Sequence, residues 1–242
     1  MPGFLFSFFL AVLLSSTFFF PVGGRAEGWK GRRRVLSAAA GSSIAYIFII
    51  LMPEIEKAGA AFRQEGVQFL PQQGTYMVNA AMMLGFVFSY ALGEIMPARE
   101  NPDRPRRYKG GFWVQVAGYG AYIALIGYLL LHSISGEEQI SRFYALSMFL
   151  HFLLIAFAFR DAHGEDYDRI GCFILSGACI AGWFLGSLVN LPRVILIPLF
   201  GFVCGGMVSV TGRVELPKGE EGRAVPFISG ALGYALFLIL FS

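Results

Sequence analysis

Eight long stretches of the chain contain no Asp, Glu, Lys or Arg, and this pattern limits the fold more than any other feature. A transmembrane helix needs about 20 mostly apolar residues, because backbone polar groups in hydrocarbon must bond within the segment. Charged residues make up 14% of the chain, against roughly a quarter in a soluble domain. The charge-free stretches cover residues 1–24, 35–53, 66–93, 110–136, 143–159, 170–192, 194–212 and 224–242. This pattern predicts an all-α integral membrane protein.

We expect a single transmembrane domain over residues 1–242, with about eight helices. The predicted helices lie near residues 4–24, 35–53, 74–97, 111–134, 143–160, 170–190, 193–212 and 224–241. The first apolar stretch has no basic residue before it and exceeds an ordinary signal-peptide core, so we expect a retained helix. Three cysteines, Cys172, Cys179 and Cys204, fall inside apolar stretches and are expected to be buried hydrophobic residues.

The distribution of Lys and Arg predicts the orientation. The connections after the first, third, fifth and seventh predicted helices hold 15 basic residues, and the other connections hold 4. Cytoplasmic loops carry the excess of positive charge, so both termini are expected outside the cytoplasm. A bacterial plasma membrane suits this orientation. The expected partner of the basic clusters is anionic lipid, and no pattern typical of nucleic-acid binding accompanies them.

Two parts of the sequence indicate an internal repeat. Gly41 precedes Pro53 by twelve residues, and Gly205 precedes Pro217 by the same interval. The following apolar stretches share a second pattern: Gly85 with Tyr90-Ala-Leu, and Gly230 with Tyr234-Ala-Leu. The first three helices would then be repeated in the last three, in the opposite direction, which is the inverted repeat of many secondary transporters.

The second stretch carries the most specific resemblance to a known family. Gly41-Ser-Ser-Ile-Ala-Tyr-Ile-Phe-Ile-Ile-Leu-Met-Pro53-Glu54 resembles the glycine-rich helix of the ZIP (Zrt/Irt-like protein) metal transporters, which ends in His-Leu-Leu-Pro-Glu. Val214-Glu-Leu-Pro217 is similar to the end of that family's penultimate helix. The resemblance implies a three-plus-two-plus-three helix arrangement, a divalent metal ion as substrate, and alternating access to a site between helices four and five.

The metal ligands of that family are mostly replaced in this chain. Where the fourth helix of the family has His-Asn-x-x-Asp-Gly, this sequence has Tyr122-Ile-Ala-Leu-Ile-Gly127. Where the fifth has His-Glu-x-x-His-Glu, it has His151-Phe-Leu-Leu-Ile-Ala156, and Ile50 replaces the histidine of the second helix. We therefore expect a degenerate metal site, with no certain cofactor and at most a divalent ion as substrate.

Polar residues still form a stripe on each of the two central helices. Tyr144, Ser147 and His151 share one face of the fifth helix by their spacing. Gln115, Tyr119 and Tyr122 form a similar stripe on the fourth, and we expect the two stripes to face each other and to line a transport pathway. If the two helices pack as in the family, Tyr122 and His151 lie at similar depth and can bond. His151 is also a candidate metal or proton ligand, the alternative being a neutral histidine that only fixes helix register.

A second candidate metal site follows the fifth helix. Asp161 and His163, with the nearby Glu165, Asp166 and Asp168, offer ligands for a metal ion. The alternative is a solvated loop whose charges balance those of neighbouring arginines.

Two functions remain open on the sequence alone. The first is a ZIP-like secondary transporter of a metal ion or another small solute. The second is a non-transporting scaffold or a subunit of a larger membrane complex, which the apolar replacements favour; a homodimer is also plausible from the resemblance. No motif of nucleotide hydrolysis, ester hydrolysis or zinc peptidase chemistry is present, so we do not expect an enzyme.

Overall fold

The described part of this computed structural model is helical throughout its regular elements. It covers residues 2–22, 31–64, 74–94, 109–132, 142–215 and 224–241. The helices are α1 (Pro2–Ser16), η1 (Thr17–Phe19), α2 (Arg32–Tyr46), η3 (Ile47–Leu51), α3 (Met52–Gln64), α4 (Gly74–Glu94), α5 (Lys109–Leu129), α6 (Arg142–His163), η4 (Tyr167–Gly171), α7 (Cys172–Leu188), α8 (Arg193–Glu215) and α9 (Ala224–Phe241). The predicted all-α class is confirmed for these residues.

The helices have the length and the surface of a membrane protein. Within the described ranges, six are long and apolar enough to cross a bilayer, and two shorter apolar helices cover Phe4–Phe19 and Ala224–Leu240. Large apolar side chains point outward from several helices, among them Phe9, Leu84 and Ile239, with exposed fractions of 67%, 58% and 69%. A chain that is apolar both inside and outside suits lipid rather than water. All three cysteines are free and buried, as the sequence predicts.

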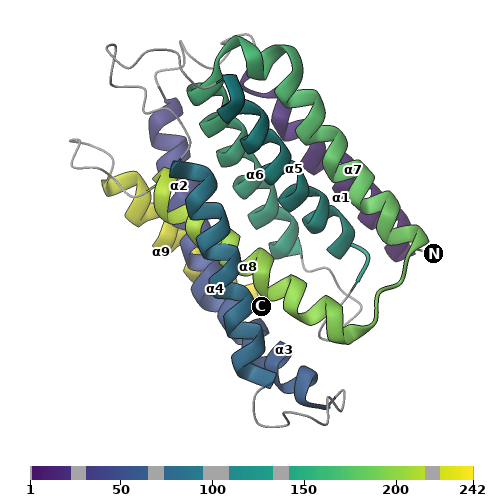
Figure 1. Cartoon of the computed structure of the whole chain (residues 1–242). Coiled ribbons are helices and arrows are strands. Elements are labelled where there is room, and N and C mark those ends of the chain that lie inside the picture. The colour runs from purple at the N-terminus through teal and green to yellow at the C-terminus, as the bar shows by residue number, and fades with distance from the viewer. Residues whose placement is uncertain are drawn as a thin grey trace.

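The helices form two bundles that lie side by side (Figure 1). Helices α1, α5, α6 and α7 make up one, called here the α5–α6 bundle. Helices α2, α3, α4, α8 and α9 make up the other, called here the α2–α8 bundle. The most extensive helix pairings, α4 with α8, α2 with α9 and α5 with α7, all lie within one bundle. Contacts between the bundles run chiefly from α2 to α6, with smaller ones from α8 to α5 and α6 and from α4 to α5.

In the α2–α8 bundle, α2 and α9 touch backbone to backbone. A methyl group built on Gly41 would lie 2.0 Å from the carbonyl oxygen of Phe227, and one built on Gly230 would lie 2.2 Å from the carbonyl oxygen of Ala38. No side chain fits at either point. Small residues that allow such close approach are typical of helix pairs in membranes, where packing replaces the hydrophobic effect.

Helices α4 and α8 cross in the equivalent way. A methyl group on Gly205 would lie 1.7 Å from the carbonyl oxygen of Met82, and one on Gly85 would lie 1.9 Å from that of Phe202. In all four contacts the carbonyl belongs to the residue three positions before the partner helix's glycine. These four glycines are the ones that define the predicted repeat. The repeat relates α2 to α8 and α9 to α4, and the α2–α9 pair packs in the same way as the α8–α4 pair. The sequence match and the helix packing therefore agree.

The relative directions of neighbouring helices follow from their contacts. Between α5 and α7 the residue numbers of the contacting pairs increase in the same direction along both helices, so these two helices are parallel. Between α1 and α7 the numbers increase along one helix and decrease along the other, so these two are antiparallel. The contacts are Ala124 with Gly182, Tyr128 with Gly186, Ser7 with Trp183, and Ser15 with Ser176. These directions agree with a chain that crosses the bilayer alternately.

The second helix extends past the predicted boundary at residue 53. It continues as α3 to Gln64, although Pro53 has no N–H to donate to a helical bond. The wider π-helical turn η3 precedes the proline, and the N–H of Met52 bonds to the carbonyl of Ile47, five residues back. This shift in the bonding pattern lets the helix pass through the proline. The predicted boundary followed the end of the charge-free stretch before Glu54, whereas the helix itself continues beyond it.

We predict that Gly41→Ala and Gly205→Ala each lower the stability of the protein in detergent, by about 1–3 kcal/mol, because a methyl group at either site meets backbone that cannot move aside. Thermal unfolding of purified variants measures the effect. Gly177→Ala and Gly233→Ala are the matched controls, since a methyl group at either position has no atom within 4 Å. Equal melting temperatures for the two sets contradict the packing described here.

Candidate functional site

Most of the polar residues singled out on α5 and α6 lie buried where the two bundles meet. Their exposed fractions are at most 5%: Gln115 0%, Tyr119 5%, Tyr122 2%, Ser147 0% and His151 0%. The side chain of Tyr144 lies outside the described residues. A buried polar group needs a partner, because its bonds to water are lost. The partners of these side chains therefore describe the site.

The centre of the site is a hydrogen-bonded pair between α5 and α6. The Tyr122 hydroxyl lies 3.1 Å from His151 Nε2, which confirms the predicted contact. The same hydroxyl donates to the carbonyl oxygen of Val203 on α8, at 3.3 Å. A tyrosine has one hydroxyl hydrogen. When that hydrogen goes to Val203, His151 Nε2–H must be the donor to Tyr122, and Nδ1 then carries a lone pair.

His151 Nδ1 is buried and has no hydrogen-bond partner among the described residues. Leaving such a group unpaired costs about 1–3 kcal/mol. The other ring nitrogen, Nε2, is held by Tyr122 and, through it, by the second bundle. With this tautomer Nδ1 is a buried acceptor, able to bind a hydrogen-bond donor or a metal ion.

Ser89 on α4 is a second polar group at this junction, and sequence reasoning missed it. A methyl group on Gly206 of α8 would lie 2.9 Å from Ser89 Oγ and 2.5 Å from a ring carbon of Tyr122, so the missing side chain leaves these two groups adjacent. Ser89 Oγ is buried without a partner in the described part of the chain. Its position inside the repeated pattern from Gly85 to Tyr90 was the available signal.

Ser147 does not bond to His151, although the two share a helix face. Its hydroxyl lies 2.8 Å from that of Tyr234 on α9. Tyr234 was noted in the sequence only as part of the repeat. Tyr119 packs the edge of its ring against Phe159 of α6, with 5.0 Å between ring centroids. The two predicted stripes thus face each other in part, and Ser147 reaches the second bundle instead.

Gln115 links three helices at one end of the site. Its Nε2 donates to the carbonyl oxygen of Leu92 at 2.8 Å, in the last turn of α4. Carbonyls in the last turn of a helix have no partner within the helix, so this bond satisfies one of them. The amide oxygen of Gln115 accepts a hydrogen bond from Nε2 of His163 on α6.

The segment of the second candidate metal site is a tight helical turn rather than a loop. Helix α6 continues to His163, and the chain reverses at Gly164, whose φ of 56° suits glycine. Asp161 bonds to Arg32 of α2, with Arg32 Nη2 at 2.7 and 2.6 Å from its two carboxylate oxygens. Asp161 and His163 therefore engage different partners. No group of three His, Cys, Asp or Glu side chains able to hold a metal occurs in the described ranges.

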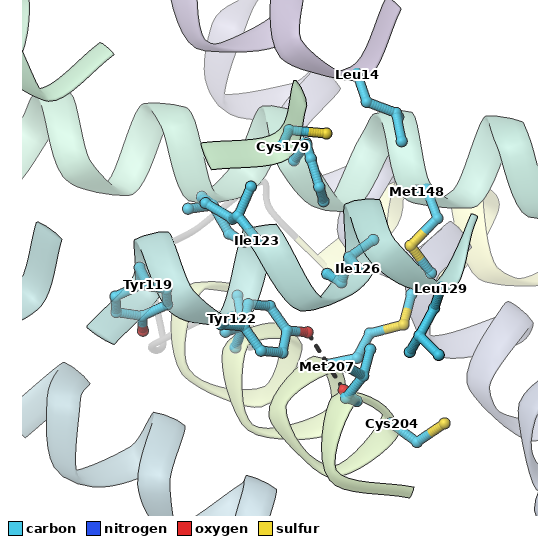
Figure 2. Packing of buried hydrophobic residues seen from close by; sticks show 14 of the residues in the cluster. Leu14, Tyr119, Tyr122, Ile123, Ile126, Leu129, Met148, Cys179, Cys204 and Met207 are labelled. Atoms are coloured by element: carbon cyan, nitrogen blue, oxygen red, sulfur yellow. Dashed lines mark hydrogen bonds between the residues drawn. The ribbon is translucent and has the colours of Figure 1, made fainter. Parts of the chain in front are cut away.

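Buried apolar residues lie close to the central pair along the sequence of α5 and α6. Ile123, Ile126 and Ile155 are exposed by 0%, 0% and 1%. Figure 2 shows Tyr122 with Ile123 and Ile126 along α5, and Met207 of α8 beside it. A neutral imidazole and hydroxyls in such surroundings offer little to offset the charge of a divalent ion.

Comparison with known proteins gave no relative: no family model matches the chain, and no significant match was found among curated proteins or solved structures. The described fold and site define a helical membrane protein with a buried histidine–tyrosine pair at the boundary of two bundles.

We predict that Tyr122→Phe destabilises the protein by about 1–3 kcal/mol, because it leaves His151 Nε2 buried and unpaired and removes the bond to the Val203 carbonyl. Thermal unfolding in detergent measures this loss. Tyr76→Phe is the control, since Tyr76 is 71% exposed. A double-mutant cycle with His151→Phe should give a coupling energy of about 0.5–3 kcal/mol. Additive effects argue against a bond between the two side chains.

Proposed function

We propose that this chain is a secondary transporter with a ZIP-like architecture and a degenerate metal site. It crosses the membrane eight times in a three-plus-two-plus-three order with an inverted repeat, with both termini outside the cytoplasm of a bacterial cell. The matching crossings of α2 with α9 and of α8 with α4 support the repeat. Each bundle contains helices from both halves of that repeat, so movement of one bundle against the other alternates access to their interface.

The observation that carries the proposal is the unpartnered Nδ1 of His151, fully buried at the boundary of the two bundles. A histidine that served only to fix helix register gains most when both of its nitrogens are bonded. Ionisable groups inside membrane proteins commonly mark a pathway for ions or protons. His151, Tyr122 and the neighbouring Gln115, Tyr119, Tyr144 and Ser147 make up the proposed pathway.

The substrate is a small solute, or a metal ion held by fewer ligands than the family uses. Divalent ions such as zinc take four nitrogen, sulfur or oxygen ligands in closed sites and at least three from the protein in open ones. The described residues bring no such group together. Asp161 and His163 contribute to metal release only if they exchange their present partners, Arg32 and Gln115, for the ion.

A second candidate function is a non-transporting scaffold or complex subunit, in which the chain acts as a homodimer or with other membrane proteins. The burial of Ile123, Ile126 and Ile155, at positions where the family carries polar ligands, in the same apolar core as Tyr122 favours it. In that case His151 and Tyr122 only fix how the bundles meet.

Flux into proteoliposomes separates the two functions. We expect saturable uptake of at least one ion from a panel of zinc, iron, manganese and cadmium, or proton movement on addition of a solute, and its loss in His151→Ala. His132→Ala is the matched control, because His132 stacks on Tyr128 at the end of α5, away from the central pair.

Folded protein that moves none of these ions and no proton contradicts transport of this kind and favours the scaffold. Equal uptake by wild type and His151→Ala would support transport but show that His151 is not part of the pathway. Size-exclusion profiles and melting temperatures of all variants establish that they are folded.

A further inference from the structure

The last turn of α6 is tied to the α2–α8 bundle on one side by a charged contact. Asp161 accepts two hydrogen bonds from Arg32 Nη2, the shorter at 2.6 Å. The Arg32 guanidinium also lies over the ring of Phe157, one turn earlier on α6, at 4.8 Å from the ring centroid. A guanidinium that bonds a carboxylate and covers an aromatic ring uses both its edge and its face. This contact holds the start of α2 against the end of α6.

The same turn is tied to α4 on the other side. His163 donates to the Gln115 amide oxygen, and the Gln115 amide nitrogen donates to the Leu92 carbonyl, so a chain of two bonds runs from α6 through α5 to α4. The Gln115 side chain is fully buried. The His163 ring also packs edge-on against Phe112. One helical turn therefore reaches both α2 and α4.

We propose that these contacts form a two-armed clamp that closes one end of the interface between the bundles. Its arms are Arg32–Asp161 and His163–Gln115–Leu92. The residues that the sequence offered as metal ligands then serve a conformational role. The clamp's role as a gate for alternating access rests on the proposed function. Its closure of this end of the interface rests only on the contacts described here.

The composition of the arms suits a contact that opens and closes. Asp161 has 38% of its side chain exposed and Arg32 has 14%, so water can replace the bonds of the ion pair when it separates. Ion pairs with this degree of exposure stabilise weakly. Gln115, His163 and the Leu92 carbonyl are neutral, so parting them separates no charges in the membrane. The deeper contact of Tyr122 with Val203 lies beyond the clamp, toward the centre of the interface.

The clamp is tested by the reactivity of a cysteine placed just beneath it. Phe159, one turn before His163 on α6, is 0% exposed and packs against Tyr119 and His163. Phe159→Cys is introduced after the native cysteines, Cys172, Cys179 and Cys204, are replaced by Ala. Labelling by a charged maleimide is followed in vesicles with the reagent on one side or on the other. We expect Arg32→Gln to raise the labelling rate about fivefold from one side only, the effect of losing one partly exposed ion pair.

Reversing the charges, with Arg32→Asp and Asp161→Arg together, should restore slow labelling, and Gln115→Leu should add to the effect of Arg32→Gln. Arg169→Gln is the matched control, because the Arg169–Glu165 pair lies within one segment and joins no bundles.

Unchanged labelling in folded Arg32→Gln and Arg32→Gln/Gln115→Leu variants overturns the clamp. If Phe159→Cys does not fold, Tyr119→Cys supplies the same readout from α5 for these variants. If the protein transports ions but labelling does not depend on the clamp residues, transport is supported and the clamp is contradicted. If labelling depends on the clamp residues but no ion is transported, the clamp is supported and the proposed transport is contradicted.

Discussion

Backbone contact through glycine is the interaction on which the rest of the structure depends. Gly41 and Gly230, and likewise Gly205 and Gly85, bring their helices together so closely that no methyl group fits between them. In lipid there is no hydrophobic drive to hold helices together, so such contacts supply the packing. Between the bundles, by contrast, the described hydrogen bonds are made by side chains, as in Tyr122 with Val203 and Ser147 with Tyr234. On the proposed function, the boundary between the bundles is the place for movement.

Several polar groups of the interior lie at that boundary. A serine hydroxyl elsewhere can bond to a carbonyl of its own helix, as Ser187 does to Phe184, whereas the longer polar side chains at the boundary reach a carbonyl, an amide or a side chain of another helix. Gln115 satisfies an end carbonyl of α4, and Tyr122 bonds to Nε2 of His151 and to a carbonyl of α8. His151 Nδ1 is buried without a partner among the described residues, and so are a few hydroxyls, Ser89 Oγ among them. The bonds at the boundary thus hold the His151 imidazole in place with one of its nitrogens unpartnered.

Sequence reasoning located the helices and the glycines of the repeat, because apolar length and residue spacing are local properties. The Tyr122–His151 bond was predicted from the helix packing that the family resemblance implies. It ended the second helix at Pro53, since the π-helical turn that accommodates the proline leaves no mark in composition. It also missed Ser89, Arg32 as the partner of Asp161, and Tyr234 as the partner of Ser147. Those pairings depend on how the two bundles meet, which no spacing within one helix specifies. The number of crossings, their orientation and the resemblance to the ZIP family stay predictions.

The central claim is that the two bundles move against each other as rigid units. Pulsed electron paramagnetic resonance in lipid tests it with spin labels at Gly177 on α7 and Met83 on α4, both exposed positions in different bundles. The account predicts two distance populations, with Arg32→Gln shifting their ratio. A control pair within one bundle, Gly177 with Val12 on α1, should give a single distance. A single distance between the bundles, unchanged by Arg32→Gln, would contradict the account and leave a rigid membrane scaffold.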